Sequence, residues 1–111
     1  MVHHSFHLDR TFSAVADPTR RRILERLGRR EASISDLAAG FGMTLTGMKK
    51  HVQVLELAGL VTSEKVGRVR TCRVGPRRLE DELEWMTMHR ERVEARLDRL
   101  EAFLQRTGGK S

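Results

Sequence analysis

Apolar residues recur at helical spacing in the middle of the chain. Within residues 45–58, Met48, Val52 and Leu55 fall in one narrow arc when each residue turns the helix by about 100°. Thr44 stands where a hydroxyl can cap the first turn. The pattern therefore predicts a capped helix with one buried face, and the opposite face carries Thr46, Lys49, Lys50 and Gln53.

A shorter apolar cluster before this helix predicts a second one. Leu37 and Phe41 lie within residues 36–41, behind two serines that can cap a helix start. Gly42 tolerates a positive φ angle, so helix, turn and helix follow one another as in a helix-turn-helix motif at residues 33–58. A helical hairpin that serves only for packing would have the same spacing.

Residues 60–74 alternate between apolar and polar types and predict a β-hairpin with Gly67 at its tip. Its acid is Glu64, whereas its cations are Lys65, Arg68, Arg70 and Arg73. A basic hairpin beside a helix-turn-helix can reach the DNA backbone as a wing.

Two more helices are predicted before the motif. The first covers residues 8–16, and Asp17 with Pro18 begins the second, which should end at Gly28. Residues 20–22 are three arginines in its first turn, where they oppose the helix dipole. They are either phosphate contacts or plain surface charge.

Residues 77–105 form the longest predicted helix. Its seam positions alternate in spacing between four and three once Arg90 is included, and they are Leu79, Leu83, Met86, Arg90, Val93, Leu97, Leu100 and Leu104. Because the rest of so short a chain offers little surface to cover this seam, we expect the helix to pair with the same helix of a second copy. Arg90 would pair with an acid such as Glu91 or Glu94. The alternative is that the helix packs on its own core.

These elements predict a mainly α fold with a small β-hairpin, arranged as a winged helix-turn-helix with a long C-terminal dimerisation helix. The length of 111 residues predicts one domain, 1–111. Within it lie the helix-turn-helix (33–58), the wing hairpin (60–74) and the dimerisation helix (77–105).

The charge distribution supports a nucleic-acid partner. The chain has 21 Lys and Arg against 15 Asp and Glu, and the whole net charge of +6 lies before residue 76. Cys72 is the single cysteine, which excludes an internal disulfide and a paired-cysteine zinc site. No apolar run suits a membrane span or a signal peptide. We therefore expect a cytoplasmic protein without a cofactor.

Most of the chain resembles the ArsR-type winged helix-turn-helix repressors of bacteria. The resemblance rests on FSAVADPTRRRILERL, ISDLA, MKKHVQVLELAGLV and EKVGRVRTCRV, in this order and at these separations. It implies a dimeric DNA-binding repressor whose helix at 45–58 enters the major groove. By matching positions, the residues facing DNA would be Thr46, Lys49, Lys50, His51, Gln53, Arg68 and Arg70.

The residues themselves add three positions to this predicted interface. They are Thr44 at the helix start, Gly47, where a close backbone approach to DNA would explain a helix-weakening residue, and Lys65 on the hairpin. His51 lies near the core edge of the helical wheel, so its assignment to DNA rests on the resemblance alone.

The metal sites of the family are not expected here. Metal-sensing members carry a Cys-x-Cys pair in a segment like ELCVCDL, whereas this chain reads EASISDL, with Ser33 and Ser35 in place of the thiolates. The other family site uses Asp and His from the paired last helices, and here His89 stands with Arg92 where a companion ligand is expected.

The sequence thus predicts a sequence-specific DNA-binding transcriptional regulator, a homodimeric repressor of an inverted-repeat operator, and no enzyme. Its expected partners are double-stranded DNA and a second copy of itself. Two alternatives stay open. One is a metal- or redox-responsive repressor that uses Cys72 or the N-terminal histidines His3, His4 and His7. The other is a protein-interaction module built on the C-terminal helix.

Overall fold

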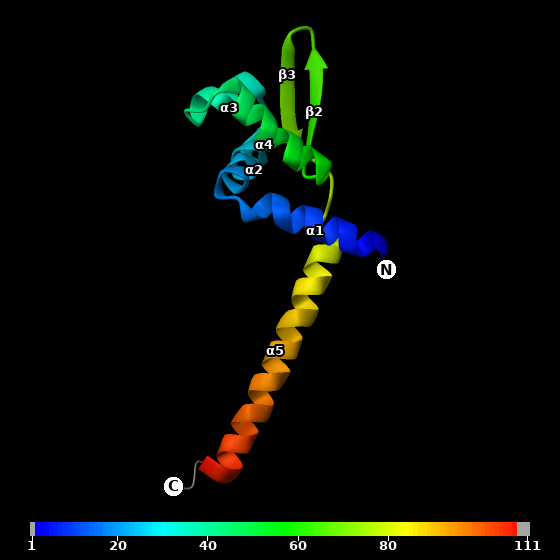
Figure 1. The fold of residues 1–111 in the computed structure, drawn as a ribbon, viewed down its shortest axis with the longest axis vertical. Helices are drawn as coiled ribbons and strands as arrows, with labels where there is room; N and C mark the ends of the chain where they lie inside the picture. Colours follow the sequence, from blue (N-terminus) through cyan, green and yellow to red (C-terminus); the bar gives the residue numbers. More distant parts are fainter. Residues whose placement is uncertain (1, 109–111) are drawn as a thin grey trace. The chain divides into compact units, whose positions relative to one another are not determined.

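A computed structural model describes residues 2–108 of the chain and the side chains of residues 7–108. The chain divides after Arg78 into two compact units. The elements are α1 (Val2–Ala16), α2 (Pro18–Arg29), β1 (Ala32–Ser33), α3 (Ile34–Gly40), α4 (Leu45–Leu57), β2 (Val61–Val66), β3 (Val69–Val74) and α5 (Glu80–Thr107) (Figure 1). The first unit contains everything up to β3, and the second contains α5.

Arginine side chains hold the turn between α1 and α2. Arg20 donates from Nε to the Ala14 carbonyl at 2.7 Å and from Nη2 to the Ser13 carbonyl at 3.1 Å. Arg21 donates from Nη1 to the Val15 carbonyl at 2.6 Å. The last carbonyls of a helix have no partner within the helix, and these two arginines supply one. Arg20 and Arg21 therefore stabilise the fold in a way that the sequence did not indicate.

The start of α2 is as predicted, but its end is not. Asp17 accepts a hydrogen bond from the Arg20 backbone N–H at 3.0 Å, and Pro18 follows at the first helical position. The predicted stop at Gly28 is wrong, because α2 continues to Arg29. The Arg26 guanidinium donates to the Arg30 carbonyl at 2.9 Å and supports this last turn.

Helix α3 begins two residues earlier than predicted because Ser33, not Ser35, caps it. The Ser33 hydroxyl accepts the Asp36 backbone N–H at 3.0 Å. At the other end, Gly42 has a φ of +64°, and its N–H donates to the Ala39 carbonyl at 3.2 Å. This is the glycine-dependent helix end that the sequence indicated.

Helix α4 has the predicted buried arc. Met48, Val52 and Leu55 are completely buried, and Thr44 caps the first turn by accepting the Gly47 N–H at 3.1 Å. The helix ends at Leu57, and Gly59, which follows the capping residue Ala58, has a φ of +76°. The α4 helix therefore lies in the core with a fixed rotation about its axis.

The hairpin belongs to a three-stranded antiparallel sheet with the order β1-β3-β2. The sequence did not predict β1, because two residues are too few to show alternation. Ala32 pairs with Cys72, and within the hairpin Lys65 lies directly opposite Arg70. The strands of the hairpin extend beyond α4 as a wing (Figure 1).

A tight joint connects α4 with the wing. The Leu60 N–H donates to the Leu55 carbonyl, and the Gly75 N–H donates to the Leu60 carbonyl, both at 2.9 Å. A Cβ atom on Gly75 would lie 2.7 Å from the Gly59 carbonyl oxygen, so no side chain fits there. The ends of α4 and of both wing strands are thus held against one another.

Helix α1 lies against the C-terminal end of α4. The Arg10 guanidinium donates to the Leu57 carbonyl at 3.3 Å, and the Arg77 guanidinium donates to the Ala58 carbonyl at 2.8 Å. Ala14 is completely buried on α1 and Thr11 is buried as well, whereas Phe12 and Val15 are half-buried.

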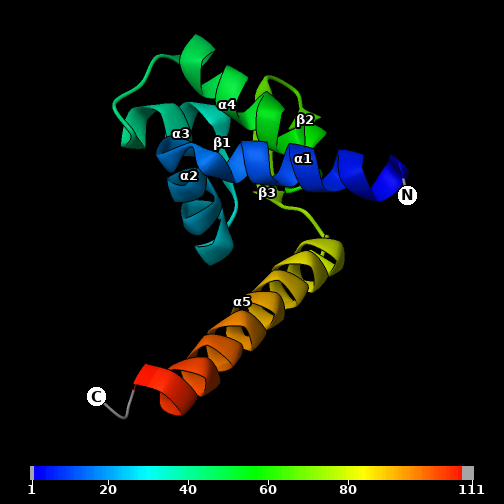
Figure 2. The same cartoon turned by 60° about the horizontal axis from the view of Figure 1, so that its bottom comes forward.

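The second unit is one uninterrupted helix, α5 (Figure 2). The predicted start at residue 77 is wrong, because Leu79 has a left-handed φ of 58° and precedes the helix. Leu79 therefore does not belong to the helical seam. The other predicted apolar seam positions lie on α5 with 42% to 58% of their surface exposed: Leu83, Met86, Val93, Leu97, Leu100 and Leu104. Arg90 pairs with Glu94 at 3.6 Å, one of the two acids expected.

None of the helices in residues 2–108 has the length and the apolar character needed to cross a lipid bilayer.

The cap of α3 can be tested with two neighbouring serines. Ser33→Ala should lower the free energy of unfolding by about 1 kcal/mol, because it removes the acceptor for the Asp36 N–H. Ser35→Ala, at an exposed position in the first turn of the helix, should change it by less than about 0.5 kcal/mol. Urea unfolding followed by circular dichroism measures both. Equal effects of the two substitutions would contradict the assigned cap.

Candidate nucleic-acid interface

The exposed side of α4 is free of acids over its first three turns. Thr46, Lys50 and Gln53 lie along one exposed stripe at helical spacing, and Lys49 flanks it on the side of the wing. The acid of α4, Glu56, is instead hydrogen-bonded to a wing residue. The stripe thus presents cations and neutral hydrogen-bonding groups to the solvent.

Gly47 has a local structural reason besides the predicted approach to DNA. A Cβ atom at this position would lie 3.1 Å from the hydroxyl oxygen of Thr44. That hydroxyl accepts the Gly47 N–H, so a side chain here would press on the cap that begins the helix. Thr44 and Gly47 together therefore form the start of α4.

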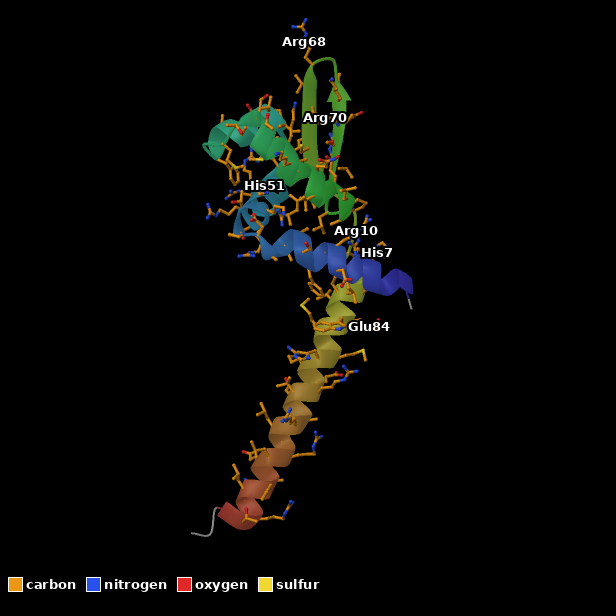
Figure 3. The ribbon with its side chains drawn as sticks, viewed as in Figure 1. His7, Arg10, His51, Arg68, Arg70 and Glu84 are labelled. Carbon is orange, nitrogen blue, oxygen red and sulfur yellow. The ribbon has the colours of Figure 1, made fainter. Side chains whose placement is uncertain are left out.

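His51 lies apart from this exposed stripe. It is half-buried, and its Nδ1 atom lies 3.3 Å from Nη1 of Arg20 and 3.9 Å from Oδ2 of Asp17. His51 thus faces the start of α2 rather than the solvent (Figure 3). The hydrogen bond from the Arg20 backbone N–H is the main reason why the pKa of the Asp17 carboxyl is lowered. The structure thus places His51 in the contact between α4 and the start of α2.

The two faces of the wing differ in charge. Val61 and Cys72 are buried on one face, and because side chains alternate along a strand, Lys65 and Arg70 share that face further out. Arg68 lies at the tip (Figure 3). This face thus continues from the core into an exposed basic surface.

Arg73 lies on the other face of the wing. Its guanidinium is 2.9 Å from the carboxylate of Glu31 and 3.6 Å from that of Glu64. Of the four cations predicted to decorate the hairpin, Arg73 is therefore already engaged by acids, and this separates it from Lys65, Arg68 and Arg70.

Ser63 and Glu56 belong to the candidate interface but were not found from the sequence. Arg70 donates from Nη1 to the hydroxyl of Ser63 at 3.0 Å, and that hydroxyl donates to Oε2 of Glu56 at 2.8 Å. These bonds join β3, β2 and α4. No sequence motif indicates them, because they depend on the strand register and on the position of α4.

The structure gives little support to a metal or redox site. Among the described residues, no group of three His, Cys, Asp or Glu side chains is placed to hold a metal ion. Ser33 caps α3, and the His89 ring stacks on Trp85 with centroids 5.4 Å apart. His7 is exposed, whereas the side chains of His3 and His4 lie outside the described residues.

Cys72 is an unfavourable redox centre. Its side chain is completely buried. Burial raises the pKa of its thiol, and the negative charge of Glu56 raises it further. Since the thiolate is the reactive form, both effects make Cys72 less reactive.

Comparisons with known proteins agree with this architecture. The sequence pattern of a family described as a helix-turn-helix domain matches residues 15–64. The transcriptional repressor SdpR of Bacillus subtilis is 27% identical over 79 residues, which cover 71% of this chain and 88% of the repressor.

Solved structures with a similar fold include members of one family. The crystal structure of an ArsR family transcriptional regulator is 39% identical, with a TM-score of 0.74, and the match covers 81% of this chain and 93% of that one. The solution structure of the homodimeric winged helix-turn-helix DNA-binding domain of Mb0332 from Mycobacterium bovis, a possible ArsR-family regulator, is 25% identical, with a TM-score of 0.61. That match covers 84% of this chain and 83% of the domain. The predicted winged helix-turn-helix fold is confirmed, and the chain belongs to the ArsR family of transcriptional regulators.

Proposed function

We propose that this ArsR-family regulator is a homodimeric repressor that reads an inverted-repeat operator with α4. The observation that carries the proposal is the exposed stripe of α4, which offers Thr46, Lys50 and Gln53 without an acid among them. The name of the similar repressor SdpR and the homodimeric state of the Mycobacterium bovis domain support it.

The chemistry of the stripe suits the edges of base pairs in the major groove. An amide such as Gln53 can bond to adenine through two atoms at once, and a lysine such as Lys50 can donate to the acceptors of guanine. A threonine hydroxyl can donate or accept, so Thr46 fits either base. Since the groove admits a helix, α4 would lie in it with Met48, Val52 and Leu55 turned away from the DNA.

The second copy is proposed to bind along α5. Among the described residues, this helix exposes a row of apolar side chains from Leu83 to Leu104, interrupted by Arg90, in the alternating spacing of a coiled-coil seam. Pairing would remove these side chains from water. Two copies of α4 related by a two-fold axis would then meet half-sites about 10 base pairs apart, or a multiple of that distance.

The reading stripe can be tested with one substitution. Lys50→Ala should weaken binding to the operator by about tenfold, since one good base or phosphate contact contributes about 1–3 kcal/mol. Arg99→Ala on α5 removes the same charge outside the proposed interface and is the control. The operator is first obtained by selecting bound fragments from genomic DNA, and affinities follow from fluorescence anisotropy. Recovery of no common palindrome, or an unchanged affinity for Lys50→Ala, would count against the proposal.

The dimer can be tested with a charge placed in the seam. Leu97→Glu should shift the chain towards monomer, because burial of each leucine contributes roughly 2 kcal/mol and a buried carboxylate adds a further cost. Ala95→Glu places the same charge on the side of α5 away from the seam and should leave the dimer intact. Sedimentation equilibrium measures both. A wild-type chain that remains monomeric at micromolar concentration would instead favour a protein-interaction module.

The redox alternative makes a different prediction about Cys72. In the folded protein we expect its thiol to react with a thiol reagent far more slowly than free cysteine does, because the side chain is buried and its pKa is raised. In denaturing urea the reaction should reach the rate of free cysteine. Rapid reaction of the folded protein, accompanied by loss of operator binding, would favour a redox-responsive repressor.

A further inference from the structure

A cleft of about 230 Å³ lies between the wing and the N-terminal ends of α3 and α4. Lys49 contributes to it from α4, and Lys65, Arg68 and Arg70 contribute from the wing. The exposed residue Ser35 also lines it, and no acid is among its described lining residues. The cleft is separate from the stripe of Thr46, Lys50 and Gln53, which lies further around α4.

The cleft concentrates positive charge. Lys65 and Arg70 lie directly opposite each other on neighbouring strands, an arrangement that is destabilising for like charges. None of the four cleft cations forms an ion pair with an acid in the part of the chain that the structure describes. By contrast, Arg73 on the other face is paired with Glu31 and Glu64. Binding of an external anion would therefore reduce the repulsion between the cations of the cleft.

Arg70 is also held in place before any anion arrives. Its Nη1 atom donates to Ser63 at 3.0 Å, and Ser63 donates to Glu56 at 2.8 Å. An arginine has several donors, so this bond leaves others for a ligand. Fixing a long side chain in advance reduces the entropy lost on binding.

The contact expected between the wing and the DNA backbone would place one phosphate in this cleft, and we propose that Ser63 and Glu56 position Arg70 for that contact. The inference rests on the proposed function, since it assumes that α4 lies in the major groove. A phosphate bordering the groove would meet Lys49 on one side and the wing on the other. The cleft then supplies affinity without sequence preference, whereas the stripe on α4 reads the bases.

Binding as a function of salt tests the phosphate site. Arg70→Ala should weaken binding to the operator and to unrelated DNA by the same factor of about ten. The plot of log K against log salt should also become less steep, with the magnitude of its negative slope smaller by about 0.9. Arg73→Ala is the matched control from the other face of the wing, and it should leave the slope nearly unchanged. A loss confined to the operator, or an unchanged slope for Arg70→Ala, would overturn the assignment.

A double-mutant cycle tests the positioning role. Ser63→Ala alone should reduce affinity several-fold, but in the Arg70→Ala background it should have no further effect. Glu56→Gln keeps an acceptor for the Ser63 hydroxyl and should retain most of the affinity that Glu56→Ala loses. Thermal unfolding checks that each variant is folded. Additive effects of Ser63→Ala and Arg70→Ala would show that Ser63 does not act through Arg70.

Two further arms separate the possible failures. Sodium phosphate should displace DNA more than sodium chloride does at equal ionic strength, because the free anion competes for the same cleft, and this difference should disappear in Arg70→Ala. A difference that persists in Arg70→Ala would place the phosphate outside the cleft and contradict the assignment. If the unmodified chain selects no operator, the proposed function fails. If it selects an operator and the double-mutant cycle is additive, the positioning role alone fails.

Discussion

The burial of one stripe of α4 determines what the rest of that helix can do. Met48, Val52 and Leu55 are completely buried, so the helix cannot rotate about its axis without exposing them to water. The opposite side of α4 consequently stays in the solvent. Helices α2 and α3 and strand β2 all pack against α4. The first unit is therefore a scaffold that presents one face of one helix.

The chain uses its many cations in two ways, and its net charge does not distinguish them. Arg20 and Arg21 donate to carbonyls at the end of α1, and Arg73 is paired with two acids. These side chains stabilise the fold. Lys50 and Arg68 have no such acid partner among the described residues, and they lie on α4 and at the tip of the wing. These two cations thus lie on the surface formed by α4 and the wing, whereas the three arginines are used within the fold.

Local features of the fold were predictable from the sequence, whereas contacts between distant residues were not. The Thr44 cap and the buried arc of α4 depend on neighbours within a few positions, so spacing alone indicated them. The pairing of Arg73 with Glu31 joins residues 42 positions apart and depends on how β1 aligns with β3. The Glu56 and Ser63 contacts likewise require the strand register. The start of α5 was misplaced because the left-handed backbone of Leu79 leaves no mark in the apolar pattern.

The joint between α4 and the wing limits how this protein can respond to a signal. Gly59 and Gly75 bring their backbones together, and the hydrogen bonds of Leu60 attach it to both α4 and the end of β3. Such a joint leaves no room for a hinge at this point, so we expect α4 and the adjoining end of the wing to move together. In the proposed dimer, an inducer would therefore release the operator by changing the separation or tilt of the two copies of α4. The arrangement of α4 and the wing within each copy would stay the same.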